Sequence, residues 1–199
     1  MRVFIVYCHP CYDSLTREVR DAFMAGLESA GHSFVLSDLY AMKFKTDMNE
    51  EEYRREAFYR RELPIPADIM AEQKKINDSD AIAFIYPLFW TEAPAKLVGW
   101  FDRVWTFGFA YGDERTMKLL EKGLVLCVAG NTLDYFKETG LGQAMEKIFL
   151  NDRLFDRVKS KELIIFDATS REIPERELFR EKHLLRAFEA GKNIAINNE

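Results

Sequence analysis

Two prolines in the middle of the sequence enclose a short segment of large flat side chains. Residues 81–86 form an unbroken apolar run, which predicts a strand buried on both faces, and Pro87 ends it because proline removes a backbone donor. Pro94 suits the first turn of a following helix. We therefore expect an aromatic wall at the carboxyl end of this strand, where open α/β sheets bind ligands. The wall consists of Pro87, Leu88, Phe89, Trp90 and Thr91. The alternative is that these side chains belong only to the core.

The junction between the first predicted strand and the first predicted helix offers donors for a phosphate. Asp13 or Ser14 suits the N-cap of this helix, and the helix dipole favours an anion at its start. Every α/β protein has several helix starts, but this one is expected next to the aromatic wall. Together the two features can hold a flat ring with a phosphate tail. The expected donors are His9, Ser14, Leu15 and Thr16.

A flavin matches these two features. Its phosphate needs N–H donors, and its ring needs flat apolar walls and backbone N–H groups. We expect those backbone groups from residues 88–90 and from residues 129–132, which follow the fourth predicted strand and include Ala129, Gly130 and Asn131. No Ser-His-Asp or Cys-His arrangement of a hydrolase is visible, and the histidines are scattered.

Strands and helices alternate along the chain in the order that builds a parallel sheet. Apolar runs predict strands at residues 2–8, 32–40, 81–86, 123–129 and 163–166. Helices are predicted at residues 15–30 and 67–78, after Pro94, at residues 135–154 and after Pro174, with a long loop at residues 106–121. The alternation predicts an α/β three-layer sandwich, with a five-stranded parallel sheet and helices on both faces. Five strands suit the flavodoxin-like version better than the longer dinucleotide fold.

Two nucleotide-binding motifs are absent from the sequence. No GxGxxG follows the first strand, which argues against a Rossmann NAD site, and no GxxxxGKS/T motif of an NTPase occurs. Residues 1–199 are predicted to form a single domain with a charged excursion at residues 41–66. We interpret the excursion as a solvated segment with a short helix; the alternative is an arm that covers a neighbouring subunit.

The composition is that of an ordinary globular protein. Of 199 residues, 48% are hydrophobic and 31% charged, and the net charge of −5 gives no support for a nucleic-acid surface. Three cysteines form neither a disulfide framework nor a CxxC pair, and Cys8, His9 and Cys11 are too few for a metal site. The first residues lead directly into a strand, so we expect no signal peptide, and no apolar run has the length of a membrane span. We expect a reducing, cytoplasmic compartment.

The sequence resembles the flavodoxin-fold NAD(P)H:quinone oxidoreductases. This group includes mammalian DT-diaphorase and the bacterial modulator of drug activity and potassium-efflux ancillary flavoproteins. The resemblance covers roughly the first 130 residues in register, and its most specific part is residues 87–104. The matching residues are His9, Pro10 and Ser14, then residues 37–42, 71–75, 86–90, 94–97, 99–104 and 109–111.

The resemblance implies a ping-pong reaction on a bound flavin. NADH or NADPH passes a hydride to the flavin and leaves, and a quinone then receives two electrons at the same place. The resemblance places the flavin phosphates at the first helix start and the ring against the aromatic wall, with Tyr111 lining the substrate pocket. Asp102 stands where the family has an acidic residue that reaches the cofactor of the other subunit, so a homodimer with sites at the interface is implied.

The sequence departs from the family after the fourth strand. Residues 128–131 read Val-Ala-Gly-Asn where the family has Thr-Thr-Gly-Gly, so two hydroxyls are lost and backbone donors remain. The tyrosine and histidine usually beside the reacting ring align with Phe136 and Gly142. Without that histidine, water, Tyr135 or Tyr111 would have to stabilise the reduced flavin. The residues expected nearest to the chemistry are Trp90, Tyr111, Gly130 and Asn131.

Cofactor and substrate identity stay open at this stage. A second pocket tyrosine of the family is replaced by Asp113, and the region beyond about residue 154 matches poorly. The long excursion favours FAD slightly over FMN. A quinone is the expected acceptor, and flat azo or nitro compounds are an alternative. A second alternative is a flavin-bound regulatory subunit that docks on a membrane transporter through the charged residues 43–61. An electron-carrier flavodoxin is disfavoured, because such proteins are more acidic and have a hydroxyl-rich phosphate loop.

Overall fold

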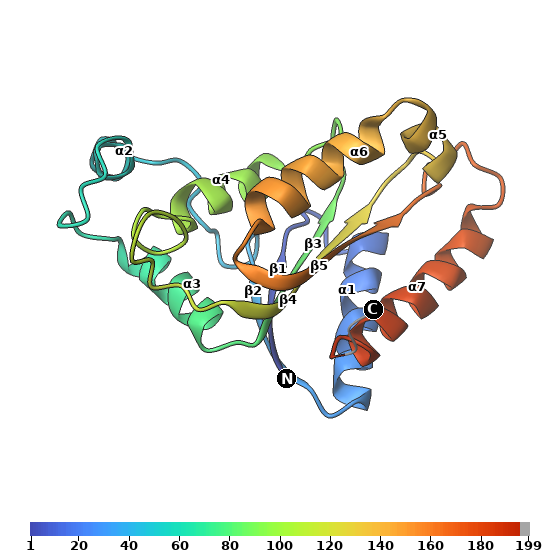
Figure 1. The fold of residues 1–199 in the computed structure, drawn as a ribbon. Helices are drawn as coiled ribbons and strands as arrows, with labels where there is room; N and C mark the ends of the chain where they lie inside the picture. The colour runs from blue at the N-terminus through green and yellow to red at the C-terminus, as the bar shows by residue number, and fades with distance from the viewer. Residues whose placement is uncertain (196–199) are drawn as a thin grey trace.

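The computed structural model describes residues 1–195 and arranges them in three layers around one sheet (Figure 1). The strands lie in the order β2-β1-β3-β4-β5, and every neighbouring pair is parallel. This confirms the predicted fold class, because 2-1-3-4-5 is the strand order of flavodoxin-like sheets. The bounds are Arg2–Tyr7 (β1), Ser33–Asp38 (β2), Ala81–Pro87 (β3), Leu120–Val128 (β4) and Val158–Phe166 (β5).

Helices cover both faces of the sheet. Figure 1 shows α1 and α7 together on one face and α3, α4 and α6 on the other. Two separate apolar cores correspond to these faces, one under α1 and α7 and one under α3, α4, α6 and η1. The bounds are Leu15–Ser29 (α1), Glu50–Ala57 (α2), Ala67–Asn77 (α3), Ala95–Val104 (α4), Leu133–Glu138 (α5), Leu141–Glu146 (α6), Lys147–Leu154 (η1, a π-helix) and Arg176–Lys192 (α7).

Strand β3 lies in the centre of the sheet and is buried along its whole length. Its side chains alternate between the two cores: Phe84 and Tyr86 belong to one, and Ala83 and Ile85 to the other. Burial on both faces explains why its sequence is apolar without alternation. The sequence predicted that the strand ends before Pro87, but Pro87 is its last residue and pairs with Val128 of β4. Proline is tolerated there because the last position of a strand does not need the missing N–H.

Several elements differ in length from their predictions. Strands β4 and β5 begin three and five residues earlier than residues 123 and 163, because their first residues pair with each other, Leu120 with Val158 and Lys122 with Ser160. The helix predicted at residues 135–154 is divided into α5, α6 and η1, with the break at Gly140, whose φ is 72°. The last helix begins at Arg176 rather than directly after Pro174.

The excursion at residues 41–66 is anchored and not simply solvated. Helix α2 within it carries a capping box in which Asn49 and Glu52 bond to each other's backbone N–H groups. Glu52 and Arg55 are buried, since Arg103 of α4 pairs with Glu52, and Arg55 donates to the carbonyl oxygen of Phe107. The excursion does contain the predicted short helix, α2, but part of that helix is buried against the body of the protein rather than solvated. The outer side of the excursion does expose three large rings, those of Tyr53, Phe58 and Tyr59.

Candidate active site

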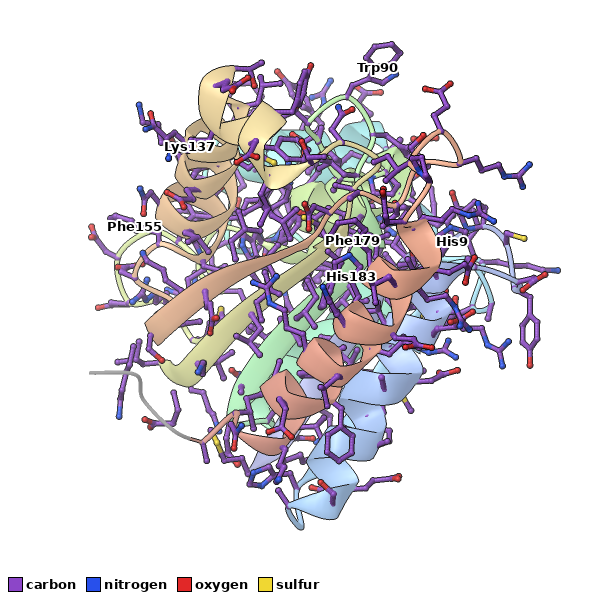
Figure 2. The ribbon with its side chains drawn as sticks, turned by 90° about the vertical axis from the view of Figure 1, so that its right-hand side faces the viewer. His9, Trp90, Lys137, Phe155, Phe179 and His183 are labelled. Carbon is purple, nitrogen blue, oxygen red and sulfur yellow. The ribbon has the colours of Figure 1, made fainter. Side chains whose placement is uncertain are left out.

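The β3–α4 loop turns sharply through the aromatic wall. Phe89 and Glu92 exchange both backbone hydrogen bonds, at 2.9 and 2.8 Å. The two residues between them, Trp90 and Thr91, have φ values of 51° and 65°, which is the pattern of a type I′ turn. The Trp90 side chain is fully exposed and Phe89 is half exposed, and Figure 2 shows Trp90 projecting from the tip of the molecule. These rings are thus not core, and they are available to a ligand or a partner.

An ion pair ties this turn to the π-helix. One oxygen of the Glu92 carboxylate accepts from the Ala93 amide at 2.7 Å and from Nη1 of Arg153 at 2.9 Å. The carbonyl oxygen of Arg153 in turn accepts from the indole N–H of Trp105 at 2.8 Å. Arg153 of η1 thus fixes the base of the turn, whereas the exposed rings of Phe89 and Trp90 take no part in these bonds.

The β4–α5 loop supplies unpartnered backbone donors. Within residues 1–195 the amides of Gly130, Asn131 and Thr132 make no hydrogen bond. Three other amides that we expected as donors are already used: Leu88 donates to Val128, Phe89 to Glu92 and Ala129 to Phe166. The donor set is therefore narrower than predicted and is concentrated at residues 130–132. The amides of Trp90 and Thr91 also lack a partner in the described part of the chain.

The start of α1 has the predicted form. Ser14 is the N-cap, and its side chain accepts from the Arg17 amide, while the amides of Leu15 and Thr16 have no partner within residues 1–195. Thr16 is almost fully buried, so its hydroxyl is not available at the surface. Nδ1 of His9 lies 3.0 Å from the Cys11 amide nitrogen, so the ring folds back onto its own loop.

Two arginines, which sequence reasoning missed, lie beside this helix start. A hollow of about 220 Å³ separates the starts of α1 and α7, and its lining includes Ser14, Thr169, Arg176 and Arg180. Arg180 pairs with Glu18 of α1 at 2.6 Å. The two arginines are four residues apart at the start of a helix, but only the fold brings that helix next to α1.

A larger cavity of about 890 Å³ lies between the aromatic wall, α4 and the excursion. It brings together the predicted residues Phe89, Trp90, Asp102 and Tyr111. The burial of Asp102 raises the pKa of its carboxyl group. The excursion adds lining residues that were not predicted: Thr46, Asp47, Met48 and Glu56.

Tyr111 is held in this cavity by a carboxylate. Its hydroxyl donates to Oε2 of Glu56 at 2.8 Å, and the same oxygen accepts from the Phe107 amide at 2.7 Å. Burial, followed by this hydrogen bond to Glu56, raises the pKa of Tyr111. The hydroxyl therefore stays protonated at neutral pH.

The region of α5 and α6 contains no replacement for the family's ionisable pair. Phe136 is buried, and Gly142 packs beside it, since a Cβ on Gly142 would lie 3.5 Å from the Phe136 carbonyl oxygen. Tyr135 is part-exposed, with its ring 5.7 Å from that of Phe136. Neither Phe136 nor Gly142 thus supplies an ionisable side chain near the end of β4.

Residues 1–195 contain neither a candidate metal site nor a candidate membrane span. No group of three or more His, Cys, Asp or Glu side chains is arranged to hold a metal ion. The three cysteines are free; Cys8 and Cys127 are buried and Cys11 is exposed. None of the described helices has the length and apolar character needed to cross a bilayer.

Comparisons with known proteins agree with this fold. A family model described as a flavodoxin-like fold matches residues 1–185. A solved NAD(P)H:quinone oxidoreductase from Methanothermobacter marburgensis has a TM-score of 0.93 and 42% identity, covering 100% of this chain and 99% of that chain. Human ribosyldihydronicotinamide dehydrogenase (quinone) is 33% identical over 159 residues, which are 70% of this chain and 68% of that protein.

The match to several curated relatives is only partial. NAD(P)H dehydrogenase (quinone) 1 of Rattus norvegicus is 37% identical over 123 residues, which are 55% of this chain and 45% of that protein. The chain thus spans about half the length of the first curated relatives it matches.

Proposed function

The chain belongs to the family with the flavodoxin-like fold, and from this premise we propose that it is a flavin-dependent oxidoreductase. NADH or NADPH is the reductant, and a quinone-like ring receives two electrons in a ping-pong reaction. The observation that carries the proposal is the set of backbone amides at α1 and at residues 130–132, which have no partner among the described residues, beside an exposed aromatic turn. The names of the archaeal and human relatives support a quinone as the acceptor.

The donors and rings present fit a flavin. The amides of Leu15 and Thr16 would hold its phosphate, and the amides of residues 130–132 would bind the polar edge of its ring. The exposed rings of Phe89 and Trp90 would cover the ring face. We also assign contacts with the bound group to His9, Ser14, Pro87, Leu88, Thr91, Ala129 and Phe136, and assign Asp102 to the site of a partner subunit.

The flavin, when bound, supplies a two-electron transfer that no side chain of the protein can perform. The protein's own part is to bind and orient the reactants. We propose Trp90 and Tyr111 as the residues that position the substrate ring. We propose the amides of Gly130 and Asn131 as fixed donors that stabilise developing negative charge, because backbone dipoles need no reorganisation.

The larger cofactor, FAD, is the form that we propose. The hollow beside the start of α1 leaves space beyond the phosphate, and Arg176 and Arg180 line it. Both arginines are paired with carboxylates, Arg180 with Glu18 and Arg176 with Glu177, so the choice rests on the space, which FMN would leave unused. Identification of the released flavin by chromatography tests this choice directly.

We further propose that the protein acts as a cytoplasmic homodimer. The fully exposed Trp90 ring and the open cavity beside α4 support an interface between two copies. The exposed free thiol of Cys11 suits a reducing compartment. Light scattering of the purified protein at several concentrations tests the dimer, and a concentration-independent monomer mass would exclude it.

The decisive experiment is purification followed by spectroscopy and turnover. We expect a flavin absorption spectrum, and oxidation of NADH or NADPH that accelerates when menadione is added. A colourless protein that cannot be reconstituted with FAD or FMN would exclude the proposed function.

The aromatic wall has its own test. Replacing Trp90 by Ala should weaken flavin binding about two- to tenfold, because one ring contact is lost. Phe155→Ala is the matched control, since Phe155 is also an exposed ring and Figure 2 shows it far from Trp90. Equal flavin affinity in the two variants would mean that the wall has been misplaced.

A regulatory subunit is the second candidate, favoured by one observation. The anchored excursion exposes the rings of Tyr53, Phe58 and Tyr59, which is a surface suited to another protein. Capture of a membrane transporter by the wild-type protein, lost when these three rings are replaced by Ser, would support it. Full quinone turnover by the protein alone does not separate the two candidates.

A further inference from the structure

The Tyr111 hydroxyl has only one proton, and a hydrogen bond within the protein already uses it. The proton is donated to Oε2 of Glu56 at 2.8 Å, and both residues line the cavity beside α4. A carboxylate oxygen only accepts hydrogen bonds. What Tyr111 can offer to a ligand in the cavity is therefore its remaining oxygen lone pairs.

The surroundings of Glu56 require it to be an acceptor. Its Oε1 accepts from Nη1 of Arg55 at 2.6 Å, and its Oε2 also accepts from the Phe107 amide at 2.7 Å. Both partners are obligatory donors, and the side chains of Arg55 and Glu56 are only 4% and 14% exposed. The ion pair with Arg55 and the amide of Phe107 leave the Tyr111 hydroxyl as the group that donates to Oε2.

Arg55 and Glu56 are fixed to the same residue of the Tyr111 loop, Phe107. Arg55 donates through Nη2 to the Phe107 carbonyl oxygen at 3.1 Å, so Arg55 and Glu56 together hold both the N–H and the C=O of one residue. This joins α2 of the excursion to the loop that carries Tyr111. Glu56 is therefore a positioning residue, separated by 55 positions from the side chain that it orients.

We propose that Glu56 makes Tyr111 a hydrogen-bond acceptor, so that the cavity selects flat ligands that carry an N–H or O–H donor. This deepens the proposed function and rests on it for the identity of those ligands. Two reactants have the required chemistry: the carboxamide NH₂ of a reduced nicotinamide and the hydroxyl of a hydroquinone product. A quinone carbonyl has no proton to donate and gains nothing from Tyr111.

The selectivity can be measured without turnover. 2-Naphthol and 2-methoxynaphthalene have the same flat ring and differ in whether the oxygen carries a proton. Calorimetric titration of each into the purified protein gives the ratio of the two dissociation constants. We expect Tyr111→Phe to reduce the preference for naphthol about two- to tenfold, the contribution of one neutral hydrogen bond. If Tyr111 instead donated to ligands, both oxygens could accept, so the same variant would weaken both compounds and leave their ratio unchanged.

Glu56→Ala and Tyr53→Phe complete the set. Glu56→Ala frees the Tyr111 proton, so binding of the ether should improve relative to naphthol. Tyr53 is on the same helix, is exposed and does not line the cavity, so Tyr53→Phe should keep the wild-type ratio. If Glu56→Ala does not fold, Tyr111→Phe alone still decides between the two directions. A ratio that is the same in the wild type, Tyr111→Phe and any folded Glu56→Ala protein would overturn the proposal.

Turnover then distinguishes the two sources of the donor. Reduced 3-acetylpyridine adenine dinucleotide has a methyl ketone in place of the carboxamide and so has no N–H to donate at this position. Each dinucleotide is compared between variant and wild type, so the difference in intrinsic reactivity between the two dinucleotides cancels. If the nicotinamide is the donor, Tyr111→Phe should raise KM for NADH two- to tenfold more than for the analogue. If the hydroquinone is the donor, product inhibition should weaken instead. A protein without flavin fails this assay but not the naphthol titration, so failure of the proposed function is recognisable.

Discussion

Arg103 of α4 holds the excursion to the body of the protein. Its Nε donates to Oε1 of Glu52 at 2.8 Å, and its Nη1 donates to Asp68 at 2.7 Å and to the carbonyl oxygen of Lys45 at 2.8 Å. The side chains of Arg103 and Glu52 are only 2% and 9% exposed, whereas that of Asp68 is 43% exposed. The buried pair with Glu52 should therefore dominate the energetics.

Replacing Arg103 by Met keeps the stem and removes the charge. Glu52 is then left buried without its cation, and breaking a buried pair from one side costs about 3–5 kcal/mol. The exposed Asp68 adds less than about 1 kcal/mol. We expect urea unfolding of the flavin-free protein to show a loss of about 3–5 kcal/mol, and the melting temperature of a domain this size to fall by roughly 10 °C.

The double variant Arg103→Met/Glu52→Gln separates a buried charge from lost packing. The Gln oxygen can still accept from the Asn49 amide, so the capping box loses little. Without a buried charge, the double variant should be at least about 2 kcal/mol more stable than Arg103→Met alone. A loss below about 1 kcal/mol in Arg103→Met, or a double variant no better than the single one, would refute the reasoning.

Three further changes probe strain, charge and close packing. Thr91→Gly should raise the free energy of unfolding by about 1 kcal/mol in urea titrations, because φ of 65° is strained for a β-branched residue; lower stability would contradict this. A hydrogen bond from the Arg2 amide is the main cause that lowers the pKa of Asp80, so its charge stabilises the fold above the unfolded pKa near 4 and less as the pH falls below it. Asp80→Asn should thus be less stable than wild type at pH 7, and the two unfolding curves should converge as the pH falls through the lowered pKa of Asp80. Gly26→Ala should destabilise by about 1–3 kcal/mol although Ala favours helices, since its Cβ would lie 2.0 Å from the Phe188 carbonyl oxygen; a rise in melting temperature would contradict the close α1–α7 contact.

The sheet and its order could be predicted because their signals are local. Residues 81–86 are apolar without alternation, and such a run is typical of a strand with both faces covered. The alternation of strands and helices then leaves few topologies, since parallel crossovers are right-handed and short. The N-cap at Ser14 was also predictable, because one residue and its two neighbours determine it.

The strand starts and the cavity could not be predicted, because they depend on partners far away in sequence. Lys122 pairs with Ser160 in the sheet, and neither residue looks like part of a strand by itself. Glu56 reads as one more charge in a mixed-sign segment, and only the fold brings it to Tyr111. A single sequence gives no signal for such long-range polar pairs, whereas apolar periodicity is visible in any window.

The missing ionisable pair leads to a last prediction, which rests on the proposed function. Phe136 and Gly142 cannot titrate, and the donors left near the end of β4 are backbone amides at residues 130–132. Backbone dipoles stabilise negative charge equally at every pH, and burial together with Glu56 raises the pKa of Tyr111 further above neutrality. We therefore expect kcat for NADH oxidation to stay constant within about twofold between about pH 6.5 and 8.5. This interval lies away from the ordinary pKa values of carboxyl and phenol groups. Stopped-flow reduction under anaerobic conditions measures the step directly. A sigmoidal pH dependence within this range would show that an ionisable group acts after all, and would contradict stabilisation by backbone groups alone.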